Sequence, residues 1–241
     1  LVSNTNGVRY LHDLNPSHLT DITKMIELFP GPFVFHTQIS NHEKLKKKFL
    51  PQINRLIQEK SEVFVPTDWK CDCKTSFFAK EDSDSLLNDI ELVKSIVWDP
   101  LDQMLSESKN IDGGLCTQQI EYAPSQSSLD HLWFNQFDKG QFQEPHDHAD
   151  GTYQNVSPTF SGIYLLELNE TNTTTFMANV GSPHSGFHFL TDHITEGSVI
   201  IFPSSLTHFV SPVKTRKTSI SFNVFSSRDH ALHWWTRNGM I

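Results

Sequence analysis

The sequence has few cysteines, no long apolar run and no cluster of basic residues apart from Lys44 and the run Lys46 to Lys48, which fits a solvated helix face. Its three cysteines, Cys71, Cys73 and Cys116, are too few for a disulfide framework, and the Cys71-Asp72-Cys73 spacing is tighter than zinc sites favour. No stretch approaches the roughly 20 apolar residues of a bilayer span, and no cationic and then apolar leader opens the chain. We therefore expect a reduced, soluble, cytoplasmic protein with no membrane partner.

Positive charge is also scarce. Lys and Arg together number 19 against 28 Asp and Glu, which gives a formal net charge of -9. Binding to nucleic acid requires clustered cations that displace counterions from phosphates. The sequence therefore predicts no nucleic-acid partner, and it leaves the oligomeric state open.

The first part of the chain, residues 1–112, is predicted to be mainly helical. Apolar residues at three- and four-residue spacings indicate helices over residues 17–28, 41–57 and 85–105, with a strand over residues 69–78. Proline removes a helical hydrogen-bond donor, so Pro51 predicts a break or kink in the second helix. We expect these helices to pack on the rest of the chain.

In the second part, residues 113–241, the spacing of the apolar residues changes. Short runs rich in aromatic and β-branched residues alternate with turn residues, which indicates an antiparallel sandwich or barrel. The expected strands are 117–122, 131–148, 160–168, 173–180, 187–190, 198–203, 208–213 and 218–225. The predicted fold class is α+β, with helices outside a β-sandwich and both parts in one structural unit.

A first group of candidate metal ligands follows an aromatic run, in Gln143-Glu144-Pro145-His146-Asp147-His148-Ala149-Asp150. Side chains alternate along a strand, so His146 and His148 project from one face, and Asp150 does too if the strand continues. Two imidazoles, or an imidazole and a carboxylate, at this spacing can hold one metal ion.

A second group lies near the end of the sequence. His208 follows the buried strand that ends at Pro203, and the next strand places four polar side chains on one face: Lys217, Ser219, Ser221 and Asn223. A polar inward stripe with a cation, beside a strand that carries a histidine, predicts a site for a small anionic ligand.

The order of these elements resembles the Fe(II)/2-oxoglutarate-dependent oxygenase superfamily, in particular its prolyl-4-hydroxylase-like branch and a bacterial and phage oxygenase family. The matching segments are 143–148, 161–166, 197–212 and 217–223, within residues 133–225. The resemblance implies a double-stranded β-helix core of the jelly-roll or cupin type. It also implies Fe(II), 2-oxoglutarate and O₂ as cofactor and co-substrates, with ascorbate as an optional reductant.

The resemblance assigns a role to each candidate residue. His208 and His148 are the first metal ligands, and His146 is the third ligand, with Asp150 as its rival. A shell of His146, His148 and His208 is neutral, whereas His148, Asp150 and His208 would include a carboxylate.

The remaining candidates would hold 2-oxoglutarate. Lys217 stands where most relatives have Arg, and Arg216 is the alternative, although it lies on the opposite strand face. Ser219 and Tyr164 would add hydroxyl donors, and Asn223 would lie near the iron pocket.

The expected function is therefore a dioxygenase that hydroxylates an unidentified substrate, such as a prolyl or other residue of a peptide or protein, or a small molecule. Two alternatives remain open. One is a cupin-like metalloenzyme that does not use 2-oxoglutarate, and the other is a non-catalytic jelly-roll binding protein.

Overall fold

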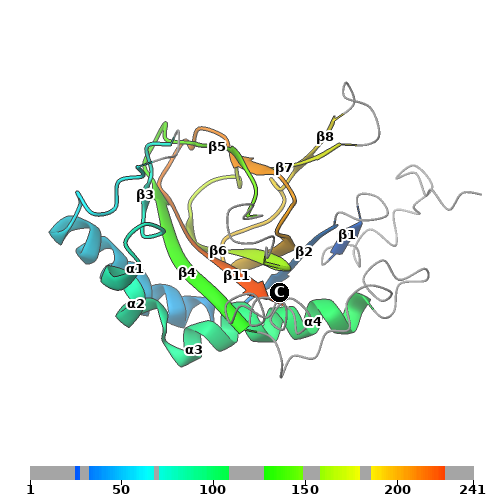
Figure 1. Ribbon diagram of the computed structural model, residues 1–241, viewed down its shortest axis with the longest axis horizontal. Coiled ribbons are helices and arrows are strands. Elements are labelled where there is room, and N and C mark those ends of the chain that lie inside the picture. Colours follow the sequence, from blue (N-terminus) through cyan, green and yellow to red (C-terminus); the bar gives the residue numbers. More distant parts are fainter. Residues whose placement is uncertain are drawn as a thin grey trace, which may run out of the picture.

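The protein is built from two facing antiparallel sheets, with helices along the outside of the larger sheet (Figure 1). The computed structural model describes residues 25–27, 33–67, 71–108, 128–148, 158–179 and 186–225. Apolar side chains from both sheets, including Ile163, Phe176 and Phe202, form the core between them. The predicted α+β arrangement is confirmed.

The larger sheet has seven strands in the order β1-β2-β9-β6-β11-β4-β3. Their bounds are β1 Met25–Glu27, β2 Phe33–Gln38, β3 Lys74–Thr75, β4 Ser128–Phe137, β6 Phe160–Leu168, β9 Ser198–Pro203 and β11 Lys217–Phe225. The last strand, β11, lies between β4 and β6 and pairs with both along its length. It is therefore fixed from both sides.

The smaller sheet has four strands in the order β5-β10-β7-β8. Their bounds are β5 Gln143–His146, β7 Thr174–Asn179, β8 Gly186–Leu190 and β10 His208–Val210. The predicted strand over residues 131–148 is thus two strands in different sheets, separated by a turn at Gly140, whose φ of 88° favours glycine. The predicted strand over residues 117–122 lies outside the described residues.

Alternation along β6 and β11 separates the two cores. Tyr164, Leu166 and Phe222 face the helices, whereas Ile163 and Leu165 face the smaller sheet. The approach of β6 to β11 is close, because a Cβ added at Gly162 would lie 2.0 Å from Cζ of Phe222. Only glycine leaves room for that ring.

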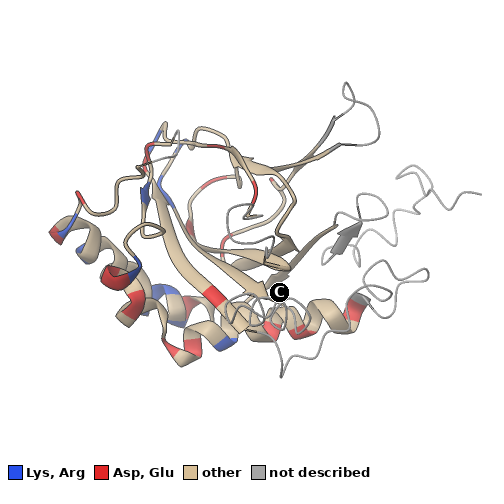
Figure 2. Cartoon of the chain, viewed as in Figure 1, with Lys and Arg blue, Asp and Glu red and all other residues tan. Residues whose placement is uncertain are grey.

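The helices cover the outer face of the larger sheet. Their bounds are α1 His42–Glu59, α2 Lys80–Leu87, α3 Ile90–Val93, a π-helix η3 Lys94–Trp98, and α4 Asp99–Ser108. Basic and acidic residues are interspersed along these helices (Figure 2). The buried side chains of α1, Leu45, Phe49 and Ile53, recur every four residues and pack into the core.

Three expectations for the helical part were wrong. The α1 helix does not break at Pro51, because the packing of its buried face outweighs one lost backbone donor, and a kink at this residue stays a prediction. The segment expected as one helix over residues 85–105 is several successive helical segments.

The third error concerns strands. Met25–Glu27, expected to be helical, and Phe33–Gln38, for which no strand was expected, extend the larger sheet next to β9. Conversely, of the strand expected over residues 69–78, the described part from Cys71 onward contains only the short strand Lys74–Thr75 and an isolated bridge at Cys71.

The division into residues 1–112 and 113–241 stays a prediction, because its boundary lies outside the described residues. Among the residues that are described, no helix combines the length and apolar composition needed to cross a membrane.

Candidate metal centre

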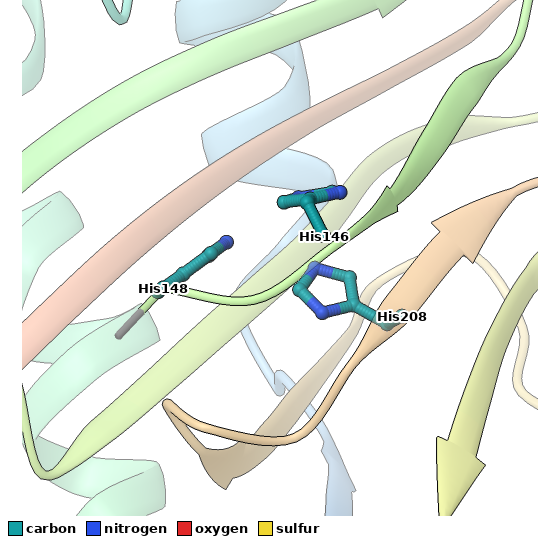
Figure 3. Close-up of side chains that lie close together, drawn as sticks. All are labelled: His146, His148 and His208. Carbon is teal, nitrogen blue, oxygen red and sulfur yellow. The ribbon is translucent and has the colours of Figure 1, made fainter. Parts of the chain in front are cut away.

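Three histidine side chains converge at one end of the space between the sheets (Figure 3). His146 ends β5, His148 follows two residues later, and His208 begins β10 directly opposite His146 in the strand register. The ring centroids are 4.3 Å apart for His146 and His208, 5.0 Å for His148 and His208, and 5.5 Å for His146 and His148. One nitrogen from each ring lies within 4.8 Å of the others.

The hydrogen bonds at Nδ1 determine which nitrogen can bind a metal. Nδ1 of His146 lies 2.8 Å from the carbonyl oxygen of Glu144, and Nδ1 of His208 lies 3.1 Å from that of Leu206. A carbonyl oxygen only accepts hydrogen bonds, so both Nδ1 atoms carry the proton. The lone pair is then on Nε2 in each of these rings.

The Nδ1 atom of His148 also carries the proton, but here the acceptor is a side chain. Its Nδ1 lies 2.9 Å from Oδ1 of Asn223, an amide oxygen that also accepts a hydrogen bond from Ser161. Ser161 in turn contacts Ser204, whose carbonyl oxygen accepts from the backbone N–H of His148. This network orients the ring and leaves its lone pair on Nε2.

The three rings are neutral at physiological pH. Burial lowers the pKa of His146, and burial together with the neighbouring His146 lowers the pKa of His148 to about 3. Burial, with the other two histidines, holds the pKa of His208 well below its usual value. Neutral imidazole is the form that binds Fe(II) and other divalent transition metals, so this donor set fits such an ion.

Lys217 lies in the same cavity as the histidines. It is fully buried, and its Nζ donates to Oγ1 of Thr174 at 2.7 Å and to Oδ1 of Asn172 at 3.0 Å. Burial lowers its pKa to about 7, an effect that the charge of Glu170 partly offsets. No carboxylate of the described residues forms an ion pair with Nζ, so a carboxylate from a ligand would supply the missing charge.

The cavity between the histidines and Lys217 has polar and apolar walls. Besides the residues already described, it is lined by Trp133, Asn135, Phe137, Gln143, Ile163, Val210, Ser219 and Ser221. Ser219 and Ser221 lie on β11 between Lys217 and Asn223, as the predicted polar stripe requires. The Trp133 ring lies 5.4 Å from the ring of His148.

Two residues expected to bind the co-substrate do not reach this cavity. The hydroxyl of Tyr164 is 2.7 Å from Nδ1 of His42 in α1, on the outer face of the sheet. Arg216 is half exposed and pairs with Asp138 at 2.9 Å, since it precedes the inward-facing Lys217 by one residue. Both assignments were wrong.

Asp150 lies outside the described residues, so the choice between it and His146 as a ligand stays a prediction. The sequence reasoning missed Asn172 and Thr174, which hold Lys217, and Ser161, which supports His148. Ser161 lies within a segment on which the family resemblance rests, and that was the available signal. Asn172 lies just before β7 and Thr174 is the first residue of that strand, and nothing in the sequence marks either as a partner of Lys217.

Comparisons with known proteins agree with this geometry. Residues 131–223 match a protein family described as "Putative 2OG-Fe(II) oxygenase". No curated protein matches the chain at a significant level. The matched segment contains all three histidines, Lys217, Ser219 and Asn223.

Solved structures with a similar fold include two enzymes of nogalamycin biosynthesis and a prolyl hydroxylase. The non-haem α-ketoglutarate-dependent carbocyclase SnoK has a TM-score of 0.53 and 9% identity, covering 89% of this chain and 85% of its own. The prolyl hydroxylase of Trichoplax adhaerens, in complex with a peptide of hypoxia-inducible factor, has a TM-score of 0.51 and 12% identity. The match covers 83% of this chain and 86% of the hydroxylase chain. The epimerase SnoN has a TM-score of 0.50 and 12% identity, and the match covers 80% of this chain and 77% of the SnoN chain.

These structures share the fold, which is the predicted double-stranded β-helix with packing helices. The family match favours the oxygenase over the cupin-like enzyme and the non-catalytic jelly roll, and it implies Fe(II), 2-oxoglutarate and O₂. Residues 131–223, which hold the three histidines and Lys217, are therefore similar to the 2OG-Fe(II) oxygenases.

Proposed function

We propose that His146, His148 and His208 bind Fe(II), and that Lys217 and Ser219 bind the distal carboxylate of 2-oxoglutarate. One observation carries this proposal: three imidazoles with protonated Nδ1 atoms converge in a cavity that they share with a buried lysine, which has no carboxylate partner among the described residues. A dicarboxylate would bind the metal through its 2-oxo acid end and the ammonium through its other end.

The chain's own groups have separate tasks in this proposal. Bound Fe(II) and 2-oxoglutarate supply the oxidising chemistry, in which O₂ converts 2-oxoglutarate to succinate and CO₂ and hydroxylates a C–H bond. The backbone carbonyls of Glu144 and Leu206 keep two imidazoles in the metal-binding tautomer, and Asn223 does so for the third. Lys217 and Ser219 set the orientation of the co-substrate.

The neutral ligand shell has an electrostatic consequence. Three imidazoles bring no negative charge to a divalent ion, whereas a carboxylate ligand would neutralise part of its charge. If the three histidines are the complete protein shell, 2-oxoglutarate supplies the compensating charge. We therefore expect Fe(II) and 2-oxoglutarate each to increase the affinity of the other.

For the hydroxylated substrate we propose a residue of a peptide or protein, with proline as the first candidate. The similar fold of the Trichoplax adhaerens prolyl hydroxylase, solved with a peptide, supports this choice. The ring of Trp133 beside His148 offers an apolar surface of the kind on which proline rings pack.

Anaerobic titration tests the proposed site. Adding 2-oxoglutarate to the Fe(II)-loaded protein should produce a weak visible absorption band with one co-substrate per chain. The band should be lost or need much more 2-oxoglutarate in Lys217→Met, and it should be unchanged in Lys214→Met, whose side chain is exposed. A wild-type protein without the band, or a Lys217→Met variant with wild-type affinity, would contradict the proposal.

A further inference from the structure

Two cysteine side chains face each other behind residues that line the proposed 2-oxoglutarate pocket. Sγ of Cys71 lies 3.6 Å from Sγ of Cys73. Cys73 is buried and Cys71 is only half-buried, so a small solute can reach one of the two sulfurs. A disulfide requires the sulfurs to approach to about 2.0 Å, a short movement from this arrangement.

The segment that carries the cysteines contacts β5 and β10, the strands that carry His146 and His208. Cys71 forms a β-bridge with Gln143, the first residue of β5, and the carbonyl oxygen of Asp72 accepts a hydrogen bond from the side chain of Gln141. Cys73 packs against Phe137 and Val210, and Val210 belongs to β10.

The cysteines also lie behind the co-substrate end of the cavity. Gln143, Phe137 and Val210 all line it, and Phe137 is the register partner of Lys217. A change in the backbone at residues 71–73 would therefore displace atoms that shape the space around Lys217. Densely packed walls transmit such displacements.

The two thiols have different acidities. The hydrogen bond from Cys73 lowers the pKa of Cys71, whereas the same bond and burial raise the pKa of Cys73. The more accessible sulfur is therefore also the one with more thiolate character. This is the order that a peroxide reaction followed by resolution requires.

We propose that Cys71 and Cys73 are an oxidisable thiol pair that hydrogen peroxide converts to a disulfide, and that the disulfide weakens 2-oxoglutarate binding. The Cys71 thiolate attacks one peroxide oxygen, which forms a sulfenic acid and releases hydroxide. The Cys73 thiol then attacks the sulfenic sulfur, the S–S bond forms, and water leaves. In sum, two thiols and one hydrogen peroxide give one disulfide and two waters.

The effect on 2-oxoglutarate rests on the proposed function, whereas formation of the disulfide does not. The disulfide fixes a new geometry at the Cys71–Gln143 bridge, at the base of the strand that presents His146. A dithiol reductant restores the original geometry. The pair would thus lower co-substrate binding when peroxide accumulates and restore it on reduction.

Peptide mass measurement tests the modification. Metal-free, reduced protein is treated with stoichiometric hydrogen peroxide, free thiols are alkylated, and trypsin cleaves after Lys70 and Lys74 to release both cysteines in one peptide. We expect this peptide to lose two hydrogen masses and to resist alkylation until reduced. Stable oxidation of Cys71 alone, a disulfide to Cys116, or an unchanged peptide would overturn the proposal.

Anaerobic 2-oxoglutarate titration tests the coupling. The Kd of peroxide-treated protein, after Fe(II) is restored, should rise about tenfold and return on reduction. Cys73→Ser and the Cys71→Ser, Cys73→Ser double variant should bind like reduced wild type before and after peroxide, which controls for oxidation elsewhere.

The two tests separate the two proposals. An equal Kd in oxidised and reduced wild type, despite a formed disulfide, would overturn the coupling. Absence of 2-oxoglutarate binding in the reduced protein would refute the proposed function, and the disulfide would then stand or fall on the peptide mass alone.

Discussion

The amide oxygen of Asn223 on β11 lies 2.9 Å from Nδ1 of His148, and it determines which nitrogen of that ring faces the centre. An amide oxygen cannot donate, so the imidazole must keep its proton on Nδ1 and its lone pair on Nε2. The contact joins the last strand of the larger sheet to the segment after β5, 75 residues away in sequence. It couples the position of a proposed metal ligand to the strand that presents Lys217.

We therefore expect a replacement of Asn223 to lower the affinity for the metal. Asn223→Ala removes the amide acceptor and leaves only the Ser161 hydroxyl, 2.8 Å from Nδ1, which can donate as well as accept and so does not fix the tautomer; Fe(II) affinity should fall roughly 10- to 100-fold. Equilibrium dialysis under anaerobic conditions measures this. Asn223→Asp keeps an acceptor at the same place and should retain most of the affinity, and equal losses in the two variants would argue against this role.

We expect Lys217 to lower the stability of the folded protein while it increases the affinity for 2-oxoglutarate. Its ammonium is buried without a carboxylate partner among the described residues, and each unit of pKa depression represents about 1.4 kcal/mol. Lys217→Met should raise the free energy of unfolding by a few kcal/mol, to order of magnitude, while 2-oxoglutarate affinity falls about 100-fold. Chemical denaturation beside the anaerobic titration checks both. A destabilised variant would show that the partners Asn172 and Thr174 already compensate the charge.

The same lysine predicts a pH dependence of stability. Its pKa is about 7 in the folded protein and near 10.4 when unfolded, so between these values the unfolded chain binds more protons. The contribution of Lys217 to the free energy of unfolding therefore increases as pH rises from 7 to 10. Subtracting the profile of Lys217→Met from that of wild type should isolate this increase, and a flat difference would contradict it.

Ligand binding should respond to pH in the opposite direction. Above pH 7 the amine of the free protein is largely neutral, and a bound carboxylate favours its protonated form. At pH 8, binding of 2-oxoglutarate should take up a proton, and its affinity should decrease as pH rises further. Calorimetry in buffers of different ionisation enthalpy measures the uptake. Lys217→Arg, which stays charged, should abolish the uptake attributable to this residue.

The corrected position of Tyr164 can also be tested. Its hydroxyl joins β6 to His42 of α1, and His42 also contacts Glu196 at 3.2 Å. Tyr164→Phe removes one buried hydrogen bond and should lower the free energy of unfolding by about 1–3 kcal/mol. Its 2-oxoglutarate affinity should equal that of wild type. A large loss of affinity would restore Tyr164 to the binding site.

The sequence predicted the site better than its surroundings. Period-two patterning placed His146 with His148, and Lys217 with Ser219, because alternation along a strand is a local property. The partner strands were not predictable in this way. Tyr164 was misplaced because its orientation depends on which face of β6 meets α1, and that depends on contacts far apart in the sequence.

The errors in the helical part have the same origin. Pro51 has a cost that local rules predict, but the burial of Phe49 and Ile53 against the sheet exceeds it. Phe33–Gln38 begins with three apolar residues after prolines and ends with polar ones, and it forms a strand that pairs with β9 and β1. Long-range pairing decided both outcomes.

The central claim is that His146, His148 and His208 form one metal centre, and the Fe(II) content of matched variants tests it most directly. Anaerobically reconstituted wild type should bind one Fe(II) per chain after desalting, and so should His188→Ala, which removes an exposed histidine. His208→Ala should retain almost none while keeping the wild-type circular dichroism. A folded His208→Ala protein that still holds one Fe(II) per chain would contradict the account.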